Sequence, residues 1–178
     1  MRSIYQVIEE INNKLSAGIS YGNNTFHNLC VKTVKNDQTL IITRKQGSIG
    51  SLISPSNLRN MIFYHRIIDE GFTPTKSGKG SNTYTFQNTV VRLVGIGRRK
   101  NISNASHWDN QEFLNEAVRV LNSNTRLSDK ETVTINNRSS DWGTVMGEEL
   151  DDEEKWKQLK LEMVVFYVDY TVQKRVVC

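Results

Sequence analysis

The fold is decided by the stretch Trp156-Lys-Gln-Leu-Lys-Leu-Glu-Met-Val-Val-Phe-Tyr-Val-Asp-Tyr-Thr-Val-Gln-Lys174. Apolar and charged residues alternate at its start, and the apolar positions resume with the opposite phase after Met163. Alternation of this kind is typical of a strand with one buried face, and Val, Phe and Tyr favour a pleated sheet. We expect one long strand whose buried face changes near Val164–Phe166, through either a β-bulge or burial of both faces. On the opposite phase from Phe166, Asp169 is expected to tolerate replacement by Asn.

Two helices are expected from capping boxes followed by apolar stripes. Ser3 starts the first box, and apolar residues at helical spacing follow from Ile4 to Leu15. Asp109 starts the second box, before an apolar stripe that ends at Leu121. Each stripe must be buried against another layer, so both helices are expected to pack on a sheet.

Several shorter segments are predicted as strands. The β-prone runs are residues 29–34 and 39–44, which predict a hairpin, 83–86 and 89–94, which predict a second hairpin across Gln87-Asn88, and Thr132–Asn136. Residues 58–70 carry an apolar stripe at helical spacing, which predicts a helix. Part of that segment, Met61–Ile68, is equally readable as a strand.

These elements predict one α+β domain over residues 1–178, with a mostly antiparallel sheet of about five or six strands packed against two or three helices. A chain of 178 residues is long enough to bury a sizeable core. Within it, residues 45–82 are expected to be an insertion and residues 138–155 a flexible acidic loop.

Charge is unevenly distributed along the chain. There are 23 Lys and Arg against 19 Asp and Glu, and removing one block of six acids leaves 23 against 13. Blocks of like charge are usually solvated loops and less often contact surfaces, and both readings stay open here. We expect the acidic block to be an assembly or lumen-facing surface whose neutralisation leaves the fold stable. It would either let DNA pass without sticking or dock on a basic neighbour, such as the turn from Arg98 to Lys100 of an adjacent subunit. The candidate interface residues are Arg98, Arg99, Lys100, Glu148, Glu149, Asp151, Asp152, Glu153 and Glu154.

The motifs of known catalytic and binding sites do not occur. His27, His65 and His107 are not at metal-ligand spacing, and the two cysteines are too few for a zinc site. Around Lys79, the sequence lacks the first Gly and the Ser or Thr of a phosphate-binding loop. We therefore expect no catalytic residue, cofactor or metal. The N-terminus lacks a secretory apolar region and no stretch approaches ~18 apolar residues, so we expect no membrane partner.

The order of elements resembles that of tail-terminator and tail-completion proteins of tailed bacteriophages. The segments that carry the resemblance are Ile4–Leu15, Val90–Val94, Phe113–Leu121 and Met163–Val172. The resemblance implies a non-enzymatic subunit of a homo-oligomeric ring in the virion, at the tail or head–tail junction, made in the host cytoplasm. It would contact portal, connector or tail proteins, and DNA would pass through the ring.

Two other classes remain open. One is a small basic nucleic-acid-binding protein that uses the turn from Arg98 to Lys100 to bind phosphates. The other is an enzyme whose site has no recognisable motif. Oligomeric mass and salt-dependent DNA binding distinguish the ring subunit from the nucleic-acid-binding protein.

Overall fold

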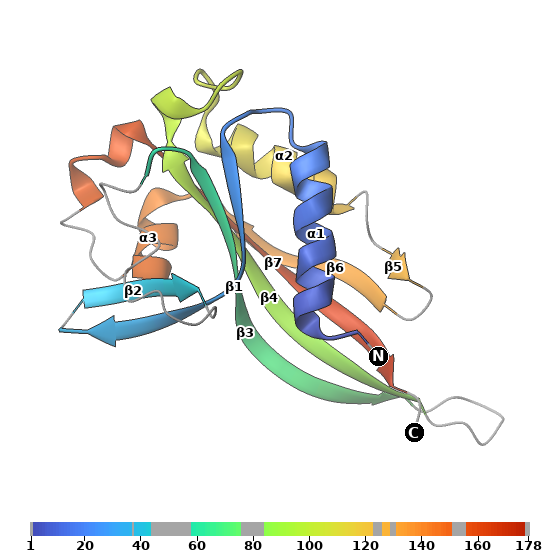
Figure 1. Cartoon of the computed structure of the whole chain (residues 1–178). Helices are drawn as coiled ribbons and strands as arrows, with labels where there is room; N and C mark the ends of the chain where they lie inside the picture. The colour runs from blue at the N-terminus through green and yellow to red at the C-terminus, as the bar shows by residue number, and fades with distance from the viewer. Residues whose placement is uncertain are drawn as a thin grey trace.

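The computed structural model describes residues 2–36, 38–43, 58–75, 84–122, 126–128, 131–150 and 156–176. These residues form one α+β domain in which helices cover both faces of a mixed sheet (Figure 1). In chain order the elements are α1 (Ile4–Gly18), β1 (Asn24–Lys35), β2 (Gln38–Thr43), β3 (Met61–Thr75), β4 (Tyr84–Arg98), the 3₁₀ helix η1 (Arg99–Asn101), α2 (Asn110–Asn122), β5 (Arg126–Ser128), β6 (Glu131–Ser139), α3 (Trp142–Leu150), the 3₁₀ helix η2 (Lys160–Glu162) and β7 (Met163–Val176).

The described strands lie in the order β2-β1-β3-β4-β7-β6-β5. Six of them form the main sheet, and β2 extends it by pairing with β1. Neighbouring strands are antiparallel throughout, except that β1 and β3 run parallel. The predicted single α+β domain, with a mostly antiparallel sheet packed against helices, is confirmed.

The core has two parts, one on each face of the sheet. On one face α1 and α2 bury Ile8 and Leu114 against β7 residues such as Phe166. On the other face α3 buries Val145 and Met146 against the neighbouring strands. Figure 1 shows α1 and α2 together on one side of the sheet and α3 on the other. Both stripes predicted from the sequence are therefore buried.

Burial of both faces of β7 explains the change of phase in its sequence. Residues 163–170 are all buried, and alternate side chains belong to the two parts of the core. The residues before Met163 do not continue the strand. Lys160–Glu162 form η2, and the side chain of Leu161 is 91% exposed. The predicted strand is thus wrong for its first residues, while burial of both faces, one of the two alternatives, accounts for the rest.

Both predicted capping boxes are present. At α1, the Gln6 backbone N–H donates to Ser3 Oγ at 3.3 Å, and the Ser3 N–H donates to Gln6 Oε1 at 2.8 Å. At α2, the Glu112 N–H donates to Asp109 Oδ1 at 2.8 Å, and the Asp109 N–H donates to Glu112 Oε2 at 2.7 Å. Each box satisfies backbone donors that the first helical turn leaves free.

Two strand predictions are confirmed, one is wrong, and the segment that was open between helix and strand is a strand. Residues 61–75 form β3 and not a helix, as the strand reading of Met61–Ile68 allowed, and residues 84–98 form the single strand β4 in place of a hairpin. The first hairpin is present as β1 and β2, and β6 contains the strand predicted at Thr132–Asn136. The expected insertion 45–82 contains β3, which occupies the middle of the sheet between β1 and β4.

The expected flexible loop over residues 138–155 is wrong for its described part. β6 continues to Ser139, and residues 142–150 form α3. Asp141 caps this helix, since its carboxylate accepts the Thr144 backbone N–H at 2.8 Å. Burial of Trp142, Val145, Met146 and Leu150 then holds the helix on the sheet. Residues 151–155 lie outside the described part of the chain.

Candidate assembly surfaces

The predicted basic turn lies at one end of the sheet. Arg98 ends β4, and Arg99 and Lys100 begin η1. Arg99 donates to the Asn110 side chain at 3.1 Å, and the Lys100 ammonium lies 3.9 Å from Glu162 with both side chains more than half exposed. An ion pair this exposed contributes little stability, so these charges remain available to a partner.

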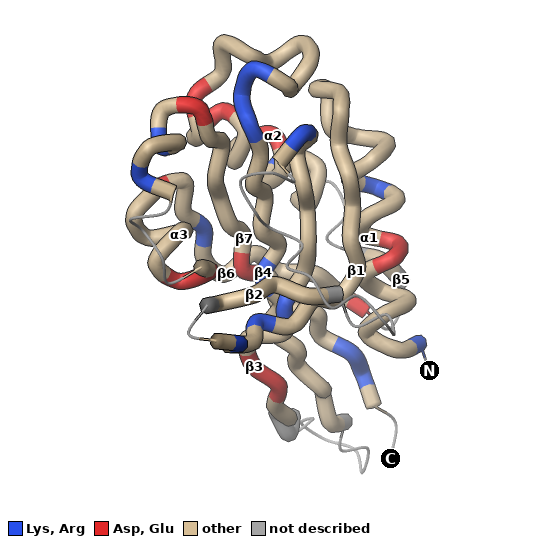
Figure 2. The backbone as a smooth tube through the Cα atoms, turned by 60° about the vertical axis from the view of Figure 1, so that its left-hand side comes forward, with Lys and Arg blue, Asp and Glu red and all other residues tan. Residues whose placement is uncertain are grey.

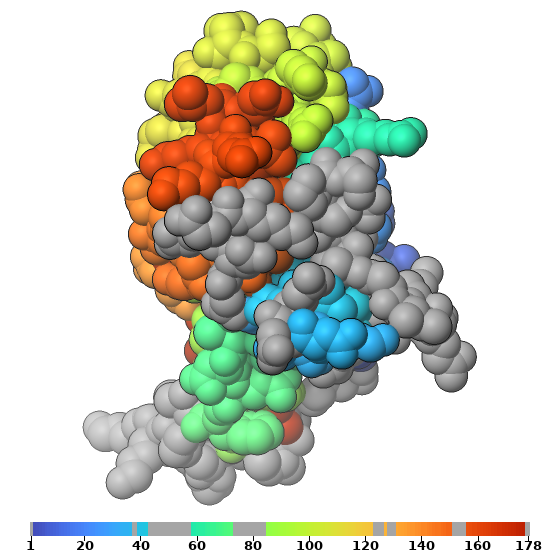
Figure 3. Space-filling model, turned by 90° about the vertical axis from the view of Figure 1, so that its left-hand side faces the viewer, coloured from blue at the N-terminus to red at the C-terminus, as the bar shows by residue number. Residues whose placement is uncertain are grey.

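A groove of about 370 Å³ opens beside this turn. We call it the basic groove, because Arg99 and Lys160 line it, with the Lys160 ammonium 5.4 Å from the ring centre of Trp142. Figure 3 shows the orange-red segment of η2 directly below the yellow-green segment that follows β4. The lining residues are Arg99, Asp109, Asn110, Gln111, Trp142, Lys160, Leu161 and Met163. Of these, Asp109 uses its carboxylate to cap α2.

The predicted acidic surface is divided by the structure. Glu148 and Glu149 lie at the end of α3, and Asp151, Asp152, Glu153 and Glu154 lie outside the described residues. The side chain of Glu148 is 44% exposed, whereas that of Glu149 is fully buried. The expectation that the whole block is solvated and dispensable for stability is therefore wrong for Glu149.

Glu149 joins α3 to the sheet. Its carboxylate accepts the Tyr64 hydroxyl at 2.9 Å, Arg66 Nε at 2.9 Å and Arg66 Nη2 at 2.6 Å. Burial and the adjacent Glu149 carboxylate raise the pKa of Tyr64 well above its usual value, so the phenol keeps the proton that it donates. This buried carboxylate has the partners that it needs within its own chain.

Arg92, on β4, extends the same network. It donates to both oxygens of Asp169 at 2.6 and 2.8 Å, binds Glu148, and lies with its guanidinium carbon 3.8 Å from the ring centre of Tyr167. Asp169 is 7% exposed, so the expectation that it tolerates Asn is not supported by its position. The carboxylates of this network, from Glu148, Glu149 and Asp169, are all bound to arginine. We conclude that the network stabilises the fold.

The far end of β3 forms a second surface, which we call the β3 arm and define as residues Ile68–Phe72. All five residues are exposed, with Ile68 at 43% and Phe72 at 67%. Asp69 and Glu70 add two negative charges, and neither is in an ion pair with another described residue. A change of register with β4 between Ile67 and Asp69 marks a bulge, which bends and twists the strand where the arm begins.

Along the arm, one edge of β3 has no partner strand among the described residues. The parallel pairing with β1 ends at Leu29 and His65, and β1 then turns away to pair with β2. Beyond that point β3 pairs, within the described residues, with β4 alone. A cavity of about 180 Å³ lies in the fork between the two strands, lined by Leu29, Cys30, Val31, Lys32, Arg66 and Ile67. An open edge of this kind is the usual place where another chain adds a strand.

The basic turn and the β3 arm lie at opposite ends of the molecule. In Figure 2 the blue segments of the turn are at one end, and the red segment of β3 is toward the other. Phe72 of β3 pairs with Gln87, near the start of β4. Arg98, at the other end of β4, pairs with Met163 of β7. Gln87 and Arg98 are eleven residue steps apart, which span about 36 Å at about 3.3 Å per residue.

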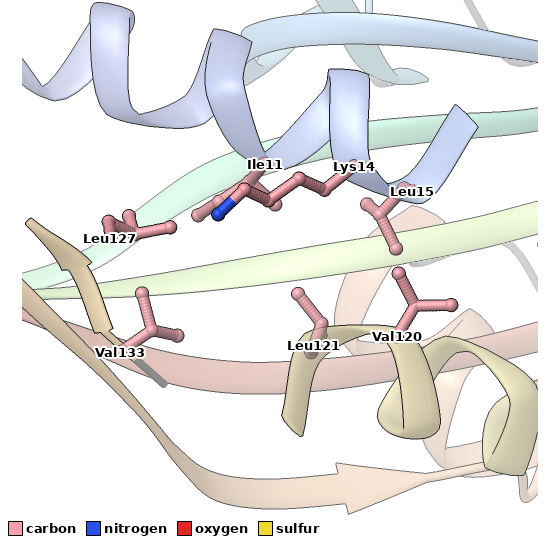
Figure 4. Close-up of a pocket in the computed structure, with 7 residues that line it drawn as sticks. All are labelled: Ile11, Lys14, Leu15, Val120, Leu121, Leu127 and Val133. Carbon is pink, nitrogen blue, oxygen red and sulfur yellow. The ribbon is translucent and has the colours of Figure 1, made fainter. Parts of the chain in front are cut away.

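Two other polar or hollow features are explained by packing. His65 is buried, with Nε2 2.8 Å from Asn12 Oδ1 and Nδ1 2.9 Å from the Tyr170 hydroxyl. A cavity of about 10 Å³ between α1, α2 and the β5–β6 strands (Figure 4) holds at most one water. No group of three or more His, Cys, Asp or Glu residues within the described ranges is placed to hold a metal ion.

Sequence reasoning missed the β3 arm. The apolar spacing of residues 58–70 predicts a helix, which would not extend to Phe72. The aromatic and β-branched residues of Met61–Ile68 were the signal for a strand. An exposed Phe beside two acids became visible only when that strand extended beyond the residues covered by β1.

The sequence matches no known protein family and no curated protein. Within the described parts of the chain, no helix is long and apolar enough to cross a membrane.

Proposed function

We propose that the protein is a non-enzymatic structural subunit that assembles with copies of itself, and that the assembly is a ring in the tail or head–tail junction of a tailed bacteriophage. The observation that supports this proposal is the β3 arm with its open strand edge. The exposed side chains of Ile68 and Phe72, and a strand edge that no other described strand covers, favour association with another chain.

The arrangement of charged groups is consistent with a structural role. The buried carboxylates of Glu149 and Asp169 bind Arg66 and Arg92, and both ring nitrogens of His65 have partners. These groups use their hydrogen-bonding capacity to hold the sheet and α3 together. Among the described residues, the basic turn and the β3 arm lie at the two ends of the sheet, and surfaces at opposite ends suit repeated contacts between identical subunits.

In this role the neighbours above and below the ring are portal, connector or tail proteins, and the subunit belongs to the virion. The resemblance of the element order to tail-terminator and tail-completion proteins supports this placement. DNA passes through the ring without sequence-specific contact.

A direct test is the mass of the purified full-length protein. Sedimentation between about 1 and 100 µM, combined with negative-stain electron microscopy, is expected to show oligomers that include closed rings. A monomer at every concentration, with no ring in the micrographs, would contradict the proposal.

The second candidate is nucleic-acid binding through the basic turn. Two cationic side chains that line one groove, Arg99 and Lys160, together with the exposed Lys100 of the adjoining turn, favour it. This function predicts binding to a DNA duplex that weakens steeply between 50 and 200 mM salt, by about one order of magnitude for every two phosphate contacts. Ring assembly without such DNA binding would favour the structural role.

A further inference from the structure

We propose that the β3 arm of one subunit docks in the basic groove of the next, so that subunits join head to tail. This joint rests on the self-assembly proposed above and names the two surfaces that form it. The occupant of the groove is a second copy of this chain, through residues Ile68–Phe72.

Charge complementarity supports this pairing. The arm carries Asp69 and Glu70 in exposed positions, and the groove carries Arg99 and Lys160. Opposite charges on two surfaces increase the rate of encounter and select the orientation of docking. The fixed acid of the groove, Asp109, is held by the α2 cap and adds little repulsion to the incoming arm.

The apolar parts of the two surfaces also correspond. Phe72 is 67% exposed, and it is the most exposed aromatic side chain among the large apolar residues of the described chain. The groove has about 370 Å³ of space beside Trp142, Met163 and the 91% exposed Leu161. An aromatic side chain entering such a pocket, within a rim of charged residues, is the usual anchor of a protein interface.

The geometry requires that the joint form between subunits. The arm and the groove are separated by about 36 Å along β4, so the arm cannot reach the groove of its own chain (Figures 1 and 3). A contact between two different surfaces of identical subunits is heterologous. It leaves a free arm and a free groove on every dimer, and it closes into a ring when the rotation per subunit divides a full turn.

Two charge-reversed variants test the joint. The arm variant is Asp69→Lys/Glu70→Lys, and the groove variant is Arg99→Glu/Lys160→Glu. Each one alone places like charges at every joint and is expected to sediment as a monomer. Mixed in equal amounts, the positive arm meets the negative groove and the unchanged arm meets the unchanged groove, so every joint becomes attractive again. We expect the mixture to reassemble into oligomers in which the two variants alternate, and to reach the mass of the unmodified protein where the ring has an even number of subunits.

Further variants separate folding from docking. Phe72→Ala is expected to weaken subunit association about 30-fold, as for a central aromatic anchor. The control for the charge-reversed variants is Glu9→Lys on the exposed face of α1. It reverses one charge outside both surfaces and should assemble normally. Thermal unfolding of each variant, followed by circular dichroism, should match that of the unmodified protein.

The outcomes distinguish the two proposals. If the unmodified protein does not self-associate, the proposed function fails and the joint fails with it. If it does self-associate and the arm and groove variants assemble as well as Glu9→Lys, the joint is wrong and the proposed function stands. If each variant is monomeric alone and the mixture is also monomeric, the arm and the groove do not bind each other.

Discussion

Replacing Glu149 by Gln should destabilise the domain strongly, although Glu149 belongs to an acidic block that reads as a solvated surface. Its side chain is fully buried and accepts four hydrogen bonds, from Tyr64, from two nitrogens of Arg66 and, at 3.4 Å, from Arg92 Nη1. Gln has nearly the same shape, but it has one acceptor oxygen in place of two. Its amide NH₂ group would face the N–H and O–H donors that now bind the carboxylate.

The magnitude follows from the burial of the arginines that would lose their partner. The side chains of Arg66 and Arg92 are 15% and 8% exposed. Removing one partner of a buried ion pair costs about 3–5 kcal/mol. Because Arg92 keeps its two hydrogen bonds to Asp169, we expect a loss near the lower end, about 3 kcal/mol. Domains are typically stable by about 5–15 kcal/mol, so this loss is a large fraction of the total.

Glu148→Gln is the matched control for this change. Glu148 is the preceding residue on the same helix and pairs with Arg92, but its side chain is 44% exposed. Its loss should cost about 1 kcal/mol or less. Urea unfolding of both variants, followed by tryptophan fluorescence, measures the difference, since Trp142 lies on α3. Equal unfolding midpoints for the two variants would refute the assignment of Glu149 to the fold.

A double variant tests the physical cause. Glu149→Leu leaves the guanidinium of Arg66 buried without its carboxylate, whereas Glu149→Leu/Arg66→Met leaves no unpaired charge there. The double variant should therefore be more stable than Glu149→Leu alone. A double variant that is less stable, by the sum of the two single losses, would show that the pair does not act as a unit.

The remaining predictions concern backbone packing and acid stability. Gly97→Ala should destabilise the domain by about 1–3 kcal/mol, because a Cβ there would lie 2.9 Å from the Met61 Cα. Gly71→Ala, where a Cβ would have no neighbour within 4 Å, should not destabilise it. Equal urea midpoints for the two variants would contradict this prediction. Burial lowers the pKa of His65 from 6.5 to about 3, so the unfolded chain binds the extra proton in this range. The free energy of unfolding should consequently fall by about 1.4 kcal/mol per pH unit as the pH drops from 6.5 toward 3, and this contribution should be absent in His65→Gln.

The hydrogen bonds around His65 determine which of its two ring nitrogens carries the proton in the neutral imidazole. The Asn12 amide nitrogen donates to His27 O at 3.2 Å and to Asn28 Oδ1 at 2.9 Å, so its oxygen faces His65. Nε2 of His65 must then carry the proton, and Nδ1 accepts the Tyr170 hydroxyl. A second proton on Nδ1 would displace this hydrogen bond inside the core, which agrees with the lowered pKa.

The two capped helices and the last strand were predictable because their signals are local. Ser3 and Asp109 each close a capping box with a residue three positions later, and the apolar stripe that follows needs only some surface to cover it. The run from Val164 to Val172 is apolar on both phases, which a strand buried on both faces requires. None of these inferences depends on which distant residues complete the core.

The identities of β3 and α3 were decided by tertiary structure. Met61–Ile68 has apolar residues that suit either a helix or a strand, and hydrogen bonds to β1 and β4 on its two sides select the strand. α3 contains Gly143 and Gly147, which disfavour a helix, and it forms because Val145 and Met146 are buried on the sheet.

The roles of the charged residues also depend on contacts between distant parts of the chain. Glu149 is 83 residues from Arg66, and Asp169 is 77 residues from Arg92. In the sequence both acids have the appearance of solvated positions, one in an acidic block and one on the polar phase of a strand. Folding places each beside a buried guanidinium, where a charge is stable only if its partner is present. Local patterns therefore specify the capped helices and the last strand, whereas contacts between distant segments determine which of the described charges hold the fold and which stay exposed.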